Sequence, residues 1–169
     1  MIQIKNIVCP IDFFPASLRA FDYALKLAAE NDAKLHVLHV VSPALPAAYD
    51  FPVDISRLVA SLVKTSKRQV LLLKHKAEKA RVDIETDVRI GTIDAEILAA
   101  IDNAKADLVV MGTHGRHGLE RWFMGSVTER MVRRCPAPLL TVPPVPPTKK
   151  RSAPRRQTLN GDKGTASQF

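Results

Sequence analysis

Five apolar segments of the chain have the length and composition of β-strands. Residues 4–11, 34–41 and 108–111 are rich in Val, Ile and Leu, which is typical of strands buried on both faces. A short apolar run at 139–142, bracketed by prolines, predicts a last strand. In residues 82–90 apolar and polar positions alternate strictly, so we expect this strand to keep one face in solvent, at a sheet edge.

Segments with helical periodicity separate these strands. Hydroxyl side chains mark three of the predicted helix starts, Ser17, Thr92 and Ser126, and Ser126 with Glu129 has the spacing of a capping box. The remaining helix is predicted over residues 54–79. Its apolar positions expected to face the sheet are Ile55, Leu58, Leu62, Leu73 and Ala77. Strands that alternate with helices predict an open parallel α/β sheet with helices on both faces, a Rossmann-like fold.

A glycine-rich block follows the predicted strand at 108–111. Residues 111–128 read MGTHGRHGLERWFMGSVT, which is the pattern G-x2-G-x9-G-S and leads into the helix expected near Ser126. Glycines let backbone N–H groups approach an anion, and the first turn of a helix adds further N–H groups and a favourable dipole. The chain contains neither a Walker P-loop nor the G-x-G-x-x-G dinucleotide fingerprint. The block therefore predicts a phosphate-binding loop of another kind.

This glycine block and two further motifs resemble the ATP-binding subgroup of the universal stress protein family. The further motifs are Pro10-x-Asp12 after the first strand and LHV at 38–40, and the resemblance spans roughly residues 4–142. It implies a five-stranded sheet in the order 3-2-1-4-5, with which the edge character of 82–90 agrees. It also implies an ATP site, with Pro10 and Asp12 at the adenosine end and the backbone of Val40 bonded to adenine. The residues that it implies for the phosphate and ribose loop are Gly112, Thr113, Gly115, Arg116, Gly125, Ser126, Val127 and Thr128.

Asp12 and the histidines of the block have more than one interpretation. An aspartate after a strand is often only a turn former, whereas the place of Asp12 at the switch point of the sheet favours ligand contact, including magnesium bound with the nucleotide. His114 and His117 have metal-ligating side chains, but no third ligand is near them in sequence, so we expect anion contact or solvent exposure. No catalytic set stands out, and Glu120 is only a weak candidate for a general base.

The net charge of +8 on 169 residues is unevenly distributed. Residues 148–169 carry six basic residues and one acidic residue, a net charge of +5, which leaves only +3 for residues 1–147. The high pI is therefore largely a property of residues 148–169 and does not indicate a nucleic-acid surface on the domain. We expect a nucleotide-binding domain over 1–147, followed by a basic, mobile tail over 148–169. The chain shows no signal-peptide pattern and no apolar run near the ~20 residues of a transmembrane helix, so a cytoplasmic location is expected. Cys9 and Cys135 are expected to be reduced structural thiols.

These observations predict an ATP-binding stress-response or regulatory protein with slow or no hydrolysis. Two other classes remain open. One is an ATP-dependent hydrolase or phosphotransferase, and the other is a nucleic-acid-associated protein that acts through the basic tail. Weak contact of the tail with nucleic acid or another anionic surface is expected to fall steeply with salt. The resemblance also implies a homodimer paired through the strand at 139–142, although flanking prolines are a known device against edge pairing.

Overall fold

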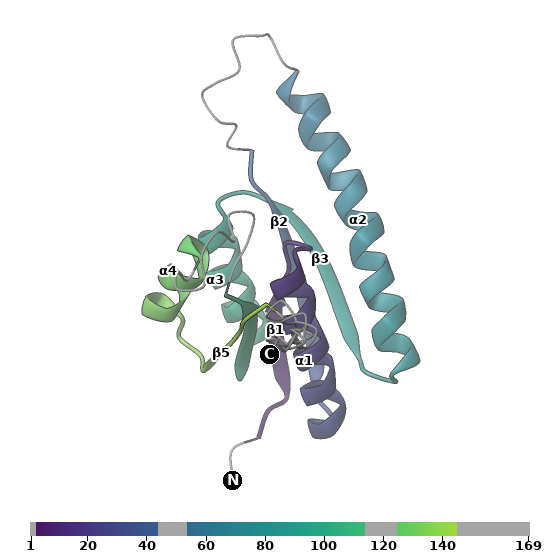
Figure 1. The fold of residues 1–169 in the computed structure, drawn as a ribbon, viewed down its shortest axis with the longest axis vertical. Coiled ribbons are helices and arrows are strands. Elements are labelled where there is room, and N and C mark those ends of the chain that lie inside the picture. Colours follow the sequence, from purple (N-terminus) through teal and green to yellow (C-terminus); the bar gives the residue numbers. More distant parts are fainter. Residues whose placement is uncertain (1–2, 44–53, 114–124, 145–169) are drawn as a thin grey trace, which may run out of the picture.

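The computed structural model describes residues 3–43, 54–113 and 125–144, which form a five-stranded parallel sheet with helices on both faces (Figure 1). The strands are β1 (Asn6–Pro10), β2 (Lys34–Val41), β3 (Ile84–Ile90), β4 (Leu108–Gly112) and β5 (Leu139–Val142). The helices are α1 (Pro15–Asn31), α2 (Ile55–Lys79), α3 (Ile93–Ala104) and α4 (Ser126–Arg134). The strand order is β3-β2-β1-β4-β5 and each neighbouring pair is parallel, which confirms the predicted fold class and order.

Alternate residues of the central strands point to opposite faces of the sheet, and each face has its own core. Ile7 and Cys9 of β1 pack with residues of α1 and with Ala77 of α2, whereas Val8 packs on the other side with α3 and with Met131 of α4. Figure 1 shows the same division, with α1 and α2 on one side of the sheet and α3 and α4 on the other. Because β1 and β4 are covered on both faces, their central residues are all apolar and buried.

Both cysteines are free thiols, and their surroundings favour a structural role. Cys9 lies in the core with no exposed surface, and this burial raises the pKa of its thiol well above the ordinary value. Cys135 follows α4 and is half-buried. A thiol that stays protonated is a poor nucleophile, so Cys9 serves as a small apolar residue of the core.

Strand β3 lies at an edge of the sheet, as its alternating pattern predicts. Ile84 at its start is 9% exposed, whereas Ile90 at its end is 54% exposed. Glu85 and Asp87, which point to the opposite face of the strand from Ile84, are exposed. The apolar side of β3 is therefore covered mainly near its beginning, where it faces the second half of α2.

The start of α1 differs from the prediction. Phe14 is the N-cap residue and Pro15 the first helical residue, so Ser17 lies inside the helix, where it is buried. Proline suits the first helical position because it has no N–H group to satisfy there. The Ser17 hydroxyl bonds to Asp12 instead of capping the helix, as described below.

The predicted cap of α4 is also wrong by one residue. Gly125 is the N-cap residue, with φ −58° and ψ 146°, and Ser126 is the first residue of the helix. Glu129 does not complete a capping box, because its carboxylate pairs with Arg133 at 3.1 Å. The N-cap position of α4 is therefore occupied by a residue without a side chain, and no hydroxyl cap stabilises the helix start.

Helix α2 is longer than the part of the sheet that it covers. Of its predicted inner positions, Leu73 contacts the core and Ala77 is buried, but Ile55 and Leu62 are 50% and 39% exposed. The first turns of α2 project beyond the ends of the strands in Figure 1, whereas the second half of the helix lies along the sheet. No helix in the described ranges combines the length and apolar character needed to cross a lipid bilayer.

Substitution of Phe21 by alanine should lower the free energy of unfolding by about 3–5 kcal/mol, because a large aromatic side chain is lost from the core. Phe21 is 1% exposed, whereas Tyr23 on the same helix is 45% exposed. Tyr23→Ala is therefore the matched control and should cost about 1 kcal/mol or less. Urea unfolding followed by circular dichroism measures both values, and equal losses for the two variants would contradict the assigned orientation of α1.

Candidate functional site

The carboxyl ends of β1, β2 and β4 lie side by side at one edge of the sheet. In the strand order β2 and β4 flank β1, and the chain leaves β1 and β4 toward opposite halves of the sheet, which makes this the topological switch point. Pro10 is the last residue of β1 and is buried, and Asp12 follows it. Val40 is near the end of β2, and Gly112 ends β4. Residues predicted as site residues from separate segments are thus brought to one carboxyl edge.

Asp12 shapes the turn between β1 and α1. Its Oδ1 accepts hydrogen bonds from the Ser17 hydroxyl at 2.5 Å and from the Phe14 N–H at 3.0 Å, and its own N–H donates to Ser17 Oγ at 3.3 Å. These bonds show that the turn-forming interpretation of Asp12 is correct. The residue is nevertheless exposed, and its second oxygen, Oδ2, takes part in none of these bonds. Asp12 therefore forms the turn through one oxygen and presents the other at the carboxyl edge.

Phe13, in the same turn, has a strained backbone. Its φ of 65° is unfavourable for a bulky side chain, and the other described residues with positive φ are found at helix C-termini. The Phe13 ring lies against His39 of β2, with ring centroids 4.7 Å apart. His39 Nδ1 is 2.7 Å from the Ile11 carbonyl oxygen, which can only accept, so Nδ1 carries the proton. Packing and hydrogen bonding to β2 thus hold the strained turn in place.

The backbone N–H and C=O groups of Val40 point toward the β1 side of β2, at a level where β1 has already ended. The pairing of β1 with β2 stops at Pro10 and Leu38, and the Leu38 carbonyl accepts from the Ile11 N–H at 2.8 Å. The Val41 carbonyl, in contrast, accepts from the Gly91 N–H at 3.2 Å on the β3 side. Backbone groups alternate between the two neighbours of a strand, so the N–H and C=O of Val40 face the space beyond the end of β1.

Backbone and side-chain hydrogen bonds bring the two ends of the glycine block together. The Gly125 N–H donates to the Thr113 carbonyl at 2.7 Å, and the Thr113 N–H donates to the Val142 carbonyl of β5 at 3.0 Å. The buried Thr128 donates its hydroxyl proton to the Gly112 carbonyl at 2.9 Å. The side chain of Thr128 therefore holds α4 to the end of β4, and the start of α4 lies at the carboxyl edge.

The first turn of α4 supplies backbone donors at this edge. The first hydrogen bond inside the helix runs from the Glu129 N–H to the Gly125 carbonyl at 2.9 Å. Helix geometry consequently leaves the N–H groups of Ser126, Val127 and Thr128 without an acceptor inside the helix. These N–H groups and the helix dipole favour an anion at the helix start.

An ion pair fixes α4 relative to α3. Arg130 Nε donates to Asp94 at 2.9 Å, and Arg134 lies 3.7 Å from the same carboxylate. The Asp94 side chain is only 15% exposed, and the hydrogen bond from Arg130 lowers the pKa of its carboxyl group. Asp94 thus stays charged at neutral pH, and the start of α4 is held against β4 by Thr128 and against α3 by Arg130.

Part of the predicted site lies outside the described residues. Gly115 and Arg116 of the phosphate and ribose loop belong to this part, as do His114 and His117. Within the described ranges, no three His, Cys, Asp or Glu side chains are grouped so that they could hold a metal ion. A magnesium role for Asp12 remains a prediction, because that role also requires oxygen atoms of a bound nucleotide.

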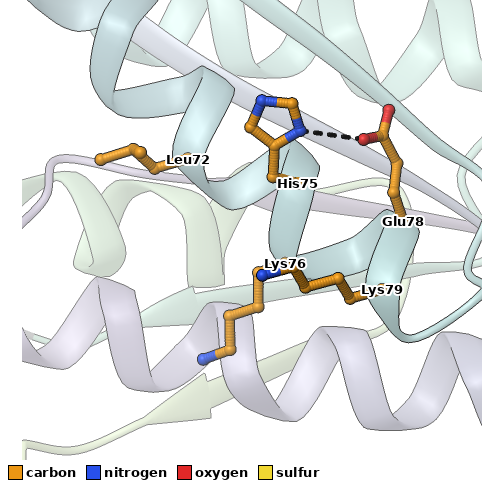
Figure 2. Close-up of a pocket in the computed structure, with 5 residues that line it drawn as sticks. All are labelled: Leu72, His75, Lys76, Glu78 and Lys79. Atoms are coloured by element: carbon orange, nitrogen blue, oxygen red, sulfur yellow. Dashed lines mark hydrogen bonds and ion pairs between the residues drawn. The ribbon is translucent and has the colours of Figure 1, made fainter.

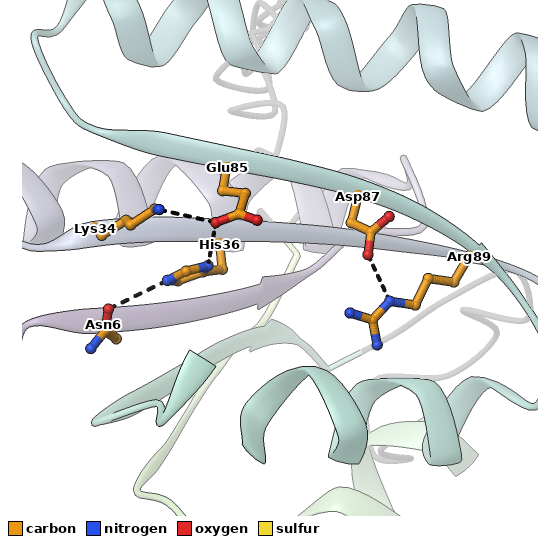
Figure 3. Close-up of polar contacts among 6 residues, drawn as sticks. All are labelled: Asn6, Lys34, His36, Glu85, Asp87 and Arg89. Carbon is orange, nitrogen blue, oxygen red and sulfur yellow. Dashed lines mark hydrogen bonds and ion pairs between the residues drawn. The ribbon is translucent and has the colours of Figure 1, made fainter. Parts of the chain in front are cut away.

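A second polar cluster, which no linear motif marks, lies between the sheet and α3 (Figure 3). Glu85 of β3 is 3.0 Å from Lys34 Nζ and 3.5 Å from His36 Nδ1, and His36 Nε2 is 3.4 Å from Asn6 Oδ1. Partial burial lowers the pKa of His36 against the opposing effect of Glu85, and the hydrogen bond from Lys34 lowers the pKa of Glu85. His36 and Glu85 line a cavity of about 120 Å³, smaller than the ~300 Å³ of ordinary ligand pockets. The cluster is therefore a network that joins three strands.

A model of the universal stress protein family matches residues 3–143, which include all three described ranges except the last residue. The chain belongs to the universal stress protein family. This universal stress protein is 38% identical over 143 residues to universal stress protein MJ0531 of Methanocaldococcus jannaschii, a match that covers 82% of this chain and 81% of that protein. The resemblance predicted from the glycine block is thereby confirmed.

Solved structures with the same fold include members of this family. UspA from Lactobacillus plantarum is 23% identical, with a TM-score of 0.74, over 83% of this chain and 98% of that chain. A universal stress protein in complex with cAMP is 25% identical, with a TM-score of 0.59, over 84% of this chain and 98% of that chain. These similarities agree with the strand order seen here.

Gly112→Ala should destabilise this universal stress protein by about 1–3 kcal/mol, because the added methyl group meets rigid backbone. A Cβ atom at Gly112 would lie 2.7 Å from both the carbonyl carbon of Ala16 and the N atom of Ser17. Gly91→Ala is the matched control, since its Cβ would first meet Oε1 of Glu96 at 2.7 Å, and that flexible side chain can move. Urea denaturation compares the two variants, and a Gly91→Ala loss as large as that of Gly112→Ala would refute this explanation.

Proposed function

We propose that this universal stress protein binds ATP with magnesium at the carboxyl edge, across the end of β1. The observation that carries the proposal is the placement of two complementary groups on opposite sides of that strand. On the β2 side the backbone of Val40 faces the space beyond β1, and on the β4 side lies the N-terminus of α4. The backbone of Val40 can form hydrogen bonds with the edge of a base, and the N-terminus of α4 can bind phosphates. The complex of a similar family member with cAMP supports an adenine nucleotide as the ligand.

The adenosine end of the nucleotide would bind at β1 and β2. A strand residue offers one N–H donor and one C=O acceptor, and the edge of adenine presents a matching acceptor and amino group, so Val40 can recognise the base through its backbone. Asp12 is an exposed residue between this backbone and β4, and its Oδ2 is suited to a ribose hydroxyl or to magnesium. Pro10 is the buried last residue of β1, so the strand ends there and leaves room for the base beyond it.

The phosphates would bind at the start of α4. The N–H groups of Ser126, Val127 and Thr128 and the dipole of the helix provide the donors, and the Ser126 side chain is exposed at the same place. Gly112 and Thr113 hold the other end of the loop, and Gly125 keeps the approach to the helix free of a side chain. Gly115 and Arg116 complete the proposed contacts.

We infer that nucleotide binding, with slow or no hydrolysis, is the biochemical basis of a stress-response or regulatory role in the cytoplasm. Rapid hydrolysis requires a positioned water molecule and neutralisation of charge at the γ-phosphate. Asp12 Oδ1 is engaged by Ser17 and Phe14, so Asp12 is better suited to binding than to activating water. Release of phosphate under multiple-turnover conditions distinguishes this role from that of an ATP-dependent enzyme.

A thermal-shift titration with ATP and magnesium tests the site. Ligand at ~100 times its dissociation constant should stabilise the wild-type protein by roughly 2.7 kcal/mol. ATP should act at lower concentration than AMP, because only ATP places all three phosphates at α4. Gly125→Val should abolish the shift and leave the melting temperature without ligand nearly unchanged, because the φ of −58° and ψ of 146° at Gly125 are open to valine.

Asp12→Asn provides a second, milder variant in the same titration. It keeps the Oδ1 acceptor for Ser17 and Phe14 but removes the charge, so it should weaken ATP binding with little change in stability. Asp102→Asn is the matched control, because Asp102 is exposed at the C-terminal end of α3, away from the carboxyl edge. Absence of an ATP-induced shift in the wild type, or an equal shift in Gly125→Val, would refute the proposed site.

We also propose that the protein forms a homodimer through β5. This strand is at the edge of the sheet next to β4, and Leu140 on it is 37% exposed. An apolar edge strand is suited to pairing with a second copy of itself, although Pro138 and Pro143 restrict the length of such a pair.

Light scattering coupled to size exclusion should give twice the chain mass of 18.6 kDa for the wild type at micromolar concentration. Leu140→Lys should shift the protein to monomer, because it places a charge in the paired edge. Ile90→Lys at the opposite edge, where Ile90 is 54% exposed, is the matched control and should remain dimeric. A monomeric wild type would rule out the dimer.

A further inference from the structure

Helix α2 carries a concentrated excess of positive charge. It contains one acidic residue, Glu78, and a net charge of +6. Its seven basic residues are Arg57, Lys64, Lys67, Arg68, Lys74, Lys76 and Lys79. The whole chain carries +8, of which residues 148–169 contribute +5 and α2 contributes +6. The residues outside these two segments therefore carry a net charge of −3. The excess positive charge of residues 1–147 is therefore concentrated on one helix.

Four basic residues of α2 share a face with an exposed leucine. The buried residues Ser66, Val70 and Ala77 face the sheet. On the opposite side of the helix, residues recur at spacings of three, four or seven and form a continuous line, which we call the outer stripe. The outer stripe consists of Arg57, Lys64, Arg68, Leu72, His75 and Lys79. Leu72 is 69% exposed and its neighbour Leu71 is 49% exposed, so two leucines lie in solvent among the cations.

Five of the seven basic residues of α2 form no ion pair with other residues of the described ranges. Lys76 lies 2.6 Å from Asp22 of α1, and Arg57 pairs with Asp54. In contrast, none of the ion pairs in the described part of the chain involves Lys64, Lys67, Arg68, Lys74 or Lys79. Figure 2 shows the difference at the end of the helix, where Lys76 points toward α1 while Lys79 and Leu72 do not. With His75 and Glu78 these side chains line a shallow hollow.

We propose that the outer stripe of α2 is a docking surface for an anionic lipid membrane. Charge complementarity supports this partner, because anionic head groups attract clustered Lys and Arg side chains. The exposed leucines select lipid over other polyanions, since the boundary between head groups and acyl chains accepts cations and apolar side chains together. A DNA backbone has no apolar group for Leu72 to contact, and the outer stripe contains no Phe, Tyr or Trp on which single-stranded bases could stack.

The geometry of α2 suits a flat surface. A helix of 25 residues is about 37 Å long, and the outer stripe follows its whole length. The inner side of the helix is packed on the sheet through Ser66, Val70 and Ala77, so the stripe is formed before any partner binds. A preformed surface does not lose the conformational entropy of folding on the membrane. The contact is peripheral, with two leucine side chains inserted and the cations at the head groups.

Co-sedimentation of the full-length protein with lipid vesicles tests the proposal. The protein should sediment with vesicles of equimolar phosphatidylglycerol and phosphatidylcholine, should remain in solution with pure phosphatidylcholine, and should be released by added salt. Lys64→Glu with Arg68→Glu should lower the partition coefficient at least about 30-fold, the factor that corresponds to ~1 kcal/mol for each of two basic residues. Leu72→Ser should lower it about fivefold, because an apolar insertion is lost.

The matched control has the same change of charge in residues 148–169, the other basic region of the chain. Arg155→Glu with Arg156→Glu should weaken vesicle binding much less than the double substitution in α2. Equal losses in the two double variants, or equal binding to anionic and neutral vesicles by the wild type, would overturn the proposal. It also fails if Leu72→Ser binds vesicles like the wild type while the α2 double variant loses affinity for duplex DNA, because the partner would then be nucleic acid.

Discussion

The close approach of Gly112 to the first turn of α1 constrains the whole carboxyl edge. The absence of a Cβ atom lets the end of β4 lie directly against the backbone of Ala16 and Ser17 on one face of the sheet. The carbonyl of the same residue accepts the hydroxyl of Thr128, which holds α4 on the other face, and Gly112 is in register with Val142 of β5. One residue therefore joins two strands and two helices where the phosphates of the proposed ligand would bind.

The turn after β1 depends on this contact. Ser17 touches Gly112 through its backbone and holds Asp12 through its hydroxyl, so the position of α1 sets the position of the carboxylate. Phe13 completes the turn in a backbone conformation that costs on the order of 1–3 kcal/mol. Packing on His39, which is itself bonded to Ile11, offsets that cost. The strained turn is thus held by packing and hydrogen bonding between β1 and β2.

The predictions from sequence were most accurate where burial alone decides the outcome. β2 and β5 have the predicted bounds, and the edge character of β3 is confirmed, because apolar periodicity reports directly which faces are covered. Helix starts were less accurate, since Ser17 and Ser126 both have cap chemistry but neither is a cap. Ser17 is drawn inward by Asp12, and Gly125 takes the N-cap position because its N–H is fixed by Thr113. The partner of Ser17 is Asp12 in the preceding turn, and the partner of Gly125 is Thr113 at the other end of the glycine block. Local sequence patterns do not reveal either hydrogen bond.

The sequence by itself determined the family, the class of fold and the segments that meet at the carboxyl edge, because periodicity and glycine spacing are local properties. Only the tertiary structure decided how the individual groups are used. It showed that the Thr128 hydroxyl donates to Gly112, that Asp12 uses one carboxylate oxygen in the turn, and that Lys64, Arg68 and Lys79 of α2 are exposed. The physical reason is that hydrogen bonds and burial depend on which elements become neighbours, and that is decided when the strands pair and the helices pack.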